Sequence, residues 1–212
     1  MININGKTEK TYNANYIHWE CTAPVPKQEL VTVPLRDGYI NLTSMLSPEI
    51  HYDPRTLTIG LELRSLREDW PMYWSQILKD LHGQEVTVAR SEDPNWFWIG
   101  TASVGPLEDH GATAGVTITV NAQPFKRTAA WKHAESVNLS GDATIDINVP
   151  YLRGYPEFEC STSNNTVTYE GETWTLPAGV STVNGLYFSV GENELALHGS
   201  GTVKVRYRGG TL

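Results

Sequence analysis

Six histidines are the first residues to test for chemistry, because imidazole binds metals and transfers protons near neutral pH. No two of them stand at a metal-binding spacing such as H-x-x-x-H. Cys21 and Cys160 are far apart in the chain and form no C-x-x-C pair. The pattern predicts no metal site, two inert thiols and a structural or surface role for each histidine, namely His18, His51, His82, His110, His133 and His198.

Paired carboxylates could serve acid/base chemistry, and glycoside hydrolysis needs two of them at a defined separation. Adjacent acids near loops occur at Glu92-Asp93 and at Glu108-Asp109-His110. Both groups stand among turn-forming residues, which favours solvated loop tips over a catalytic pair. The sequence also lacks the G-x-S-x-G elbow of hydrolases and the G-x-x-x-x-G-K-[ST] loop that binds nucleotides. We therefore predict no enzyme activity and no bound cofactor.

The chain has seven tryptophans, and exposed aromatic rings stack on sugars and anchor protein interfaces. Trp74 falls on a helical stripe, and Trp96 and Trp98 share one face of an expected strand, so these three are predicted core residues. Trp131 and Trp174 stand outside such patterns. They are the two candidate contact residues of the sequence.

The formal net charge is −8, and the pI is near 5.2. Binding to a phosphate backbone needs clustered Lys and Arg, so this balance argues against specific nucleic-acid binding. The first residues lack the basic and apolar regions of a secretory signal, and no run approaches roughly 18 apolar residues. The sequence predicts a soluble protein, made in a reducing cytoplasm, that does not insert into a membrane.

The elements that would position these residues are mostly strands. Pro24 and Pro26 are expected to break pairing after the first strand, because proline cannot donate to a ladder. Asp37-Gly38 is a turn signal that predicts a hairpin. Alternating apolar and polar residues predict strands at 12–20, 30–34, 39–43, 55–64, 84–90, 96–101 and 115–122, with a loop at 91–95.

One helix is expected between the fourth and fifth of these strands. Trp74, Ile77, Leu78 and Leu81 have helical spacing. Pro71 suits the first helical position, and Gly83 suits the position just after a helix end. The apolar stripe of this helix must therefore pack on a sheet.

Near Pro124 the pattern changes to shorter and more polar strands separated by glycines. We expect two domains, 1–127 and 128–212. The fold class is mostly β, with a β-barrel or β-sandwich-like first domain that contains one α-helix and a galectin-like (jelly-roll) β-sandwich as the second domain. The expected strands of the second domain are 136–139, 143–149, 157–161, 166–169, 173–176, 186–190, 194–198 and 202–208.

Five short motifs follow one another across residues 30–127. They are centred on Arg36-Asp37-Gly38, on the strand led by Arg55, on His82-Gly83, on Asp93-Pro94 with Gly100, and on Pro124. In this order they resemble the N-terminal domain of the distal tail proteins of long-tailed bacteriophages. Gln84 and Gln123 depart from the family pattern, which has a lysine and an acid at these loop edges.

The resemblance implies a structural baseplate-hub protein at the tail tip of a virion. In that family the first domain forms a hexameric ring around the DNA channel, joins the tail tube protein and holds a tail-associated fibre or lysin protein. The second domain projects outward. In different relatives it docks a receptor-binding protein or carries a module that binds host saccharide.

Two other functions stay open on the sequence alone. A carbohydrate-binding module that attaches to host cell-surface saccharide would need an exposed aromatic platform. A glycan-degrading enzyme would need a carboxylate pair in a cleft. If six copies close a ring, the net charge of −8 on each copy predicts an acidic channel wall that repels DNA.

Overall fold

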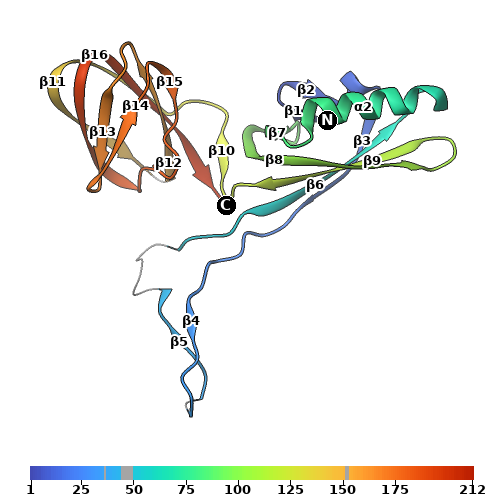
Figure 1. The fold of residues 1–212 in the computed structure, drawn as a ribbon, viewed down its shortest axis with the longest axis horizontal. Helices are drawn as coiled ribbons and strands as arrows, with labels where there is room; N and C mark the ends of the chain where they lie inside the picture. The colour runs from blue at the N-terminus through green and yellow to red at the C-terminus, as the bar shows by residue number, and fades with distance from the viewer. Residues whose placement is uncertain (36, 44–49, 151–152) are drawn as a thin grey trace. The chain divides into compact units, whose positions relative to one another are not determined.

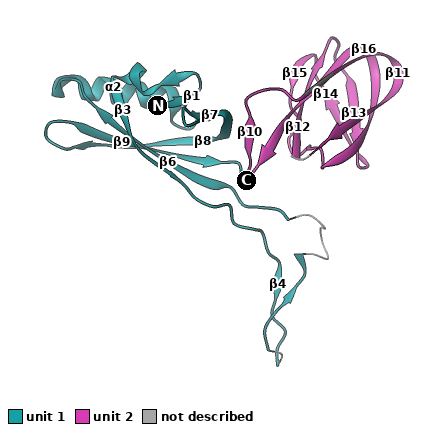
Figure 2. Ribbon diagram, turned by 180° about the vertical axis from the view of Figure 1, so that it is seen from behind, with its two compact units in different colours: residues 1–124, 212 teal, residues 125–211 magenta. Residues whose placement is uncertain are grey.

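The computed structural model describes residues 1–35, 37–43, 50–150 and 153–212, and most of them lie in antiparallel β-strands (Figure 1). Contacts divide the chain into two compact units, which are unit 1 (residues 1–124 with Leu212) and unit 2 (residues 125–211) (Figure 2). Each unit has its own buried apolar cluster. The prediction of a mostly β fold is confirmed. Among the described residues, no helix is long and apolar enough to cross a bilayer.

The body of unit 1 is one antiparallel sheet in the order β2–β1–β7–β8–β9–β6–β3. This sheet stays open and does not close into a barrel. Its first hairpin, β1–β2, was not predicted from the sequence. The strands are β1 (Ile2–Ile4), β2 (Lys7–Thr8), β3 (Ala14–Cys21), β6 (Arg55–Leu63), β7 (Glu85–Arg90), β8 (Asp93–Asp109) and β9 (Ala114–Ala122).

Strict alternation gives the sheet of unit 1 one apolar face and one polar face. Leu57 and Ile59 on β6 pair with Val120 and Ile118 on β9, and all four side chains are fully buried. Burial of one such side chain contributes about 1.5–3 kcal/mol. The residues between them are mainly threonines that point to the other face. The strands predicted at 55–64 and 115–122 are confirmed.

Helix α2 (Trp70–Leu81) packs on the apolar face of this sheet, as predicted. Proline stands in its first turn, where the missing N–H has no intrahelical partner to lose. Ile77 and Leu81 are fully buried. Gly83 has a φ of +73° just beyond the helix end, and its N–H donates to the carbonyl of Ala102 at 2.8 Å. This glycine fastens the end of α2 to β8.

Strand β8 is longer than expected. The predicted loop 91–95 is wrong beyond Glu92, because Asp93 already pairs with Arg90 and the turn is confined to residues 91–92. A register shift between Ala89 and Arg90 admits this tight connection. The strand then continues through 96–101 to Asp109.

Residues 22–35, 37–43 and 50–54 form a two-stranded extension of β3 and β6, which we call the arm (Figure 1). It ends in the antiparallel pair of β4 (Leu30–Val31) and β5 (Ile40–Asn41). The hairpin predicted from Asp37-Gly38 is confirmed, although its strands are short. Arg36 and residues 44–49 lie outside the described residues.

The expectation that Pro24 and Pro26 break the pairing holds for the regular ladder, which ends at Cys21, but is wrong for Pro26 itself. Pro26 forms a bridge with Tyr52. The two flanking hydrogen bonds use the amide of Lys27 and the carbonyl of Val25, at 2.8 Å each. Pro26 needs no N–H of its own because these neighbours supply both groups.

Unit 2 consists of two antiparallel sheets that share their two longest strands. β11 (His133–Val149) pairs over its whole length with residues 191–207 of β16 (Gly191–Thr211). One end of β16 also pairs with β12 (Arg153–Cys160), which pairs with β15 (Gly179–Ser181). The other end pairs with β13 (Asn165–Tyr169), which pairs with β14 (Glu172–Leu176). The core lies between these sheets.

Two strand breaks predicted for unit 2 are wrong. The expected strands 136–139 and 143–149 are one strand, β11, and 194–198 and 202–208 both lie in β16. Gly141 and Gly199 face each other in the ladder, with φ values of +127° and +146°. They bend both strands from one sheet into the other without ending them.

The prediction of a strand at 186–190 in unit 2 is also wrong. This stretch makes only an isolated bridge between Phe188 and Gly154. It belongs to a loop, residues 182–190, between β15 and β16. The short strand β15 was not predicted. The strands expected at 157–161, 166–169 and 173–176 correspond to β12, β13 and β14.

Candidate functional site

The acidic groups considered for catalysis lie at opposite ends of β8. Glu92 is in the β7–β8 turn, where it pairs with Arg90 at 3.3 Å. Asp109 ends β8 and pairs with Arg67. The length of a 17-residue strand separates the two groups, so they cannot act on one bond. Each one forms an ion pair with a neighbouring arginine at one end of the strand.

His110 and His198 each pair with one carboxylate, and no described histidine is part of a larger cluster of metal-binding side chains. Among the described residues, no three His, Cys, Asp or Glu side chains are placed to hold a metal. His198 pairs with Asp142 at 2.5 Å, and His110 lies 3.6 Å from Glu108. Cys160 is buried, and burial raises the pKa of its thiol, which disfavours the reactive thiolate.

The family-motif residues of unit 1 do not form one site. Gly38, at the tip of the arm, has a φ of +77°, and Asp37 beside it is exposed. Asp93 and Pro94 begin β8, and Pro124 is the last residue before unit 2. His82 follows α2, and its Nδ1 accepts a hydrogen bond from the amide of Val104 at 3.1 Å. The described residues of these motifs shape turns and strand ends.

Among these motif residues, Gly100 is the one whose identity has the clearest steric explanation. A Cβ at this position would lie 2.3 Å from the carbonyl oxygen of Asn121 and 2.5 Å from the Cα of Ala122. Both atoms belong to the backbone of the neighbouring strand β9. Only glycine lets β8 and β9 approach this closely.

Trp131, one of the two candidate contact residues, packs against its own unit. The guanidinium groups of Arg206 and Arg208 lie 4.3 and 3.9 Å from its ring centroid. Arg206 also donates from Nε to a carboxylate oxygen of Glu157 at 2.6 Å. The ring is half-buried and held by cation–π contacts, so Trp131 is engaged within unit 2.

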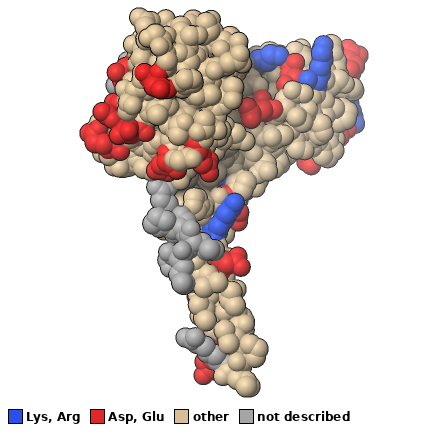
Figure 3. Space-filling model, turned by 60° about the vertical axis from the view of Figure 1, so that its left-hand side comes forward, with Lys and Arg blue, Asp and Glu red and all other residues tan. Residues whose placement is uncertain are grey.

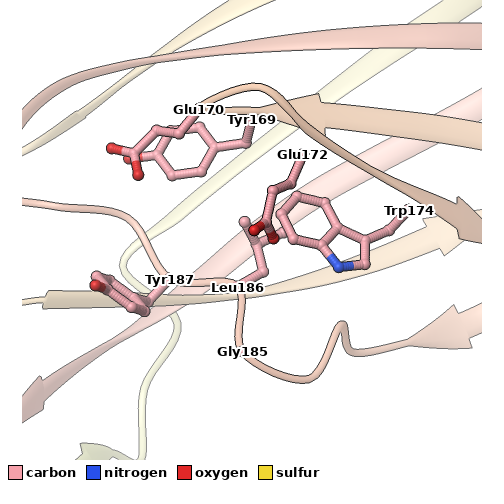
Figure 4. A pocket seen from close by; sticks show the side chains of 7 residues that line it. All are labelled: Tyr169, Glu170, Glu172, Trp174, Gly185, Leu186 and Tyr187. Atoms are coloured by element: carbon pink, nitrogen blue, oxygen red, sulfur yellow. The ribbon is translucent and has the colours of Figure 1, made fainter. Parts of the chain in front are cut away.

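Trp174, the other candidate, lines a pocket of about 210 Å³ in unit 2. Figure 4 shows Trp174 and Tyr187 on either side of Leu186, with Glu172 beside the indole and Glu170 beside Tyr169. Leu186 is buried, whereas both carboxylates are exposed. The structure therefore brings aromatic rings and carboxylates together around an apolar floor.

The β13–β14 hairpin positions half of this pocket. Tyr169 pairs with Glu172 across a two-residue turn. Glu170 and Gly171 in the turn have φ values of +50° and +85°, as a type I′ turn requires. Asn-Gly is favoured at these positions, and a left-handed glutamate is strained. Glu170 therefore presents its carboxylate at a cost in local stability.

Replacing Glu170 with asparagine is expected to stabilise unit 2 by about 0.5–1 kcal/mol, because asparagine adopts the left-handed conformation more easily. Urea unfolding measures the change. Glu172→Asn is the matched control, and it is expected to destabilise the unit because asparagine is disfavoured within a strand. A loss of stability in Glu170→Asn would show that the glutamate is not strained.

The loop at 182–190 supplies the other half of the pocket, and buried Asn193 holds it in place. The Asn193 Oδ1 accepts hydrogen bonds from the Tyr169 hydroxyl at 2.6 Å and from the Ser189 amide at 2.9 Å. Its Nδ2 donates to the carbonyls of Ser189 and Gly191 at 2.9 Å each and of Ile147 at 3.2 Å. Burial also raises the pKa of the Tyr169 phenol. One amide thus ties the loop to β11 and β13.

Sequence reasoning selected Trp174 but missed Glu170, Glu172 and Tyr187. The available signal was the Glu170-Gly171 pair between two alternating runs, which is a two-residue hairpin connection. Such a turn places its flanking residues opposite each other. Tyr187 carried no comparable signal, because the path of its loop depends on the distant contact with Asn193.

Comparison with known proteins identifies a solved structure with a similar fold. No protein-family model and no curated protein matches this sequence. A solved structure that does match is that of SPP1 Dit, described as a paradigm of the hub adsorption apparatus in phages that infect Gram-positive bacteria. The match covers 100% of this chain and 98% of that chain, with a TM-score of 0.56 and 14% sequence identity. The two chains share an overall fold.

Proposed function

We propose that this chain is a non-enzymatic structural subunit of a phage tail tip, in which six copies close a hub ring. The observation that carries the proposal is the arm. The fold shared with a hub adsorption protein supports this proposal. Such a protein would reside in the virion.

The arm exposes large apolar side chains on a narrow ribbon. Val25 is 61% exposed, Tyr39 is 63% exposed, and Leu35 at the tip is fully exposed. The visible surface of the described arm is largely uncharged (Figure 3). A two-stranded hairpin is at best marginally stable alone in water, and a clustered apolar surface marks an interaction site. A second copy of the chain, or a neighbouring tail protein, would cover these side chains.

We assign the two halves of the chain separate tasks. The first domain, residues 1–127, would form the ring and bind the tail tube protein and a tail-associated fibre or lysin protein. The second, residues 128–212, would be a galectin-like platform that docks a receptor-binding protein. The separate cores of units 1 and 2 support this division.

Light scattering after size-exclusion chromatography tests the ring. The full chain is expected to have six times the mass of one 23.6 kDa subunit. A variant with Val25→Thr, Val31→Thr and Tyr39→Thr is expected to run as a single subunit, since threonine keeps the strand preference and removes apolar contact. The matched control is Val180→Thr with Val190→Thr, two exposed positions of unit 2, which should keep the ring. A full chain that stays monomeric, or an arm variant that still forms the ring, contradicts the proposal.

The polar face of the unit 1 sheet suits the wall of a DNA channel. Within β6, β7, β8 and β9, the described positions on this face carry no Lys or Arg. Glu85 lies at one end of this face, and Glu20 of β3 lies opposite Thr58. The exposed side chains between them are neutral hydroxyls and an amide: Thr87, Thr101, Ser103, Thr117, Thr119 and Asn121.

We expect duplex DNA to bind the assembled protein only weakly, because Lys and Arg contacts to phosphates dominate nucleic-acid affinity and the described positions of this face carry neither residue. Fluorescence anisotropy at low salt measures the affinity. Sub-micromolar binding that weakens steeply with salt would mean that a basic surface lines the channel.

A further inference from the structure

The pocket of unit 2 combines the groups that recognise a sugar ring. Trp174 offers a broad, half-buried aromatic face, and Tyr187 offers a second ring across Leu186 (Figure 4). A pyranose has an apolar face of C–H groups and a rim of hydroxyls. The lining of this pocket is more polar than apolar, so it offers hydrogen-bonding groups around the aromatic face of Trp174.

The polar atoms of the pocket can act as both acceptors and donors. Glu172 forms no ion pair with a described residue, so its carboxylate can accept hydrogen bonds from sugar hydroxyls. Glu170 brings a second carboxylate from the strained turn position. The Nε1 of Trp174 has no hydrogen-bond acceptor among the described residues, so it can donate to a hydroxyl oxygen. Hydroxyl groups need both kinds of partner.

The type I′ turn holds Glu170 in a left-handed conformation, with a φ of +50°. This conformation puts the Glu170 carboxylate at the tip of the hairpin, where the residue lines the pocket. Asparagine would form the same turn but would bring no carboxylate to the pocket.

The charges in the pocket disfavour an anionic ligand. Two carboxylates line it, and they would repel phosphate or carboxylate groups. The Arg153 guanidinium, 3.9 Å from the ring centroid of Tyr187, offsets part of this negative charge. The volume of about 210 Å³ is below the range of drug-sized sites, and it suits a single ring.

We propose that this pocket binds one neutral hexose or N-acetylhexosamine residue of a glycan, stacked on Trp174 and oriented by Glu170 and Glu172. Binding at such a small site is weak, with a Kd of about 1 mM. The site lies wholly within unit 2 and does not depend on ring formation. If six copies assemble, however, the repeated sites would raise avidity on a surface glycan without any new contact.

Titration of the full-length chain, followed by tryptophan fluorescence and by the indole N–H resonances, tests the site. The probes are glucose, galactose and N-acetylglucosamine, with glycerol phosphate as an anionic probe and trilysine as a cationic probe. We expect saturable binding of at least one neutral sugar. Trp174→Leu should weaken it at least about tenfold, and Glu172→Gln about threefold or more. The Trp174 indole resonance should shift on binding.

The matched control is Glu194→Gln, an exposed carboxylate on β16 outside the pocket, which should leave the Kd within about twofold. Glu170→Asn adds a decisive comparison, because we expect it to fold at least as well as the parent chain and yet to bind the sugar more weakly. The proposal is overturned if no neutral sugar saturates the protein, if trilysine or glycerol phosphate binds in their place, or if the Trp174 and Glu172 variants bind like the parent chain.

Discussion

Gly100→Ala is expected to lower the free energy of unfolding of unit 1 by about 3 kcal/mol or more. The added methyl would lie 2.3 Å from a carbonyl oxygen of β9, and a backbone atom cannot swing aside as a flexible side chain can. Since β9 pairs with both β8 and β6, moving it disturbs two ladders at the centre of the sheet. Scanning calorimetry and hydrogen exchange measured by mass spectrometry would report the loss.

The control for Gly100→Ala is Thr101→Ala, at the next position of the same strand. Thr101 is exposed on the polar face, so its truncation should cost about 1 kcal/mol or less. Amide exchange should quicken in unit 1 of Gly100→Ala and stay unchanged in unit 2. A Gly100→Ala protein as stable as its control would mean that β8 and β9 can separate without loss.

Asn193→Ala is expected to destabilise unit 2 by about 3 kcal/mol. The substitution leaves the buried Tyr169 hydroxyl and the backbone groups of the 182–190 loop without their partners, and unmade buried hydrogen bonds cost more than made ones contribute. Asn193→Asp keeps the shape but loses both amide donors, so we expect it to destabilise unit 2 as well.

Asn138→Ala is the control for this second prediction. Asn138 is exposed on β11, and among the described residues its side chain accepts one hydrogen bond, from the Thr202 hydroxyl, so its loss should cost about 0.5 kcal/mol. In the Asn193 variants exchange should quicken in unit 2 and leave unit 1 unchanged, the reverse of the Gly100 result. If both variants loosen both units equally, residues 1–127 and 128–212 do not behave as separate domains.

The periodic elements of unit 1 could be predicted because their burial is decided locally. Every second residue of β6 faces the core, and the helical spacing from Trp74 to Leu81 admits one arrangement on a sheet. The turn residues Gly38 and Gly83 also behave as expected, since their positive φ values are a property of the turn itself. In each case the decisive interactions are close in sequence.

The errors arise where distant pairing decides the outcome. Gly171 ends a strand and Gly141 only bends one, although both have positive φ. The difference is that Gly141 faces Gly199 within a long ladder that continues on both sides. For the same reason, only part of the pocket could be predicted from the sequence. The position of Tyr187 depends on the hydrogen bonds that Asn193 makes to the 182–190 loop, and not on the local sequence around Tyr187.

The chain enters and leaves unit 2 at neighbouring points. Lys126 of strand β10 (Lys126–Thr128) pairs with Thr211 of β16, and Arg127 pairs with Gly210. A module whose two ends are adjacent can be exchanged for another with similar end spacing without redirecting the rest of the chain. Unit 2 therefore has the end geometry of an exchangeable module, whose replacement would leave the sheet and helix of unit 1 intact.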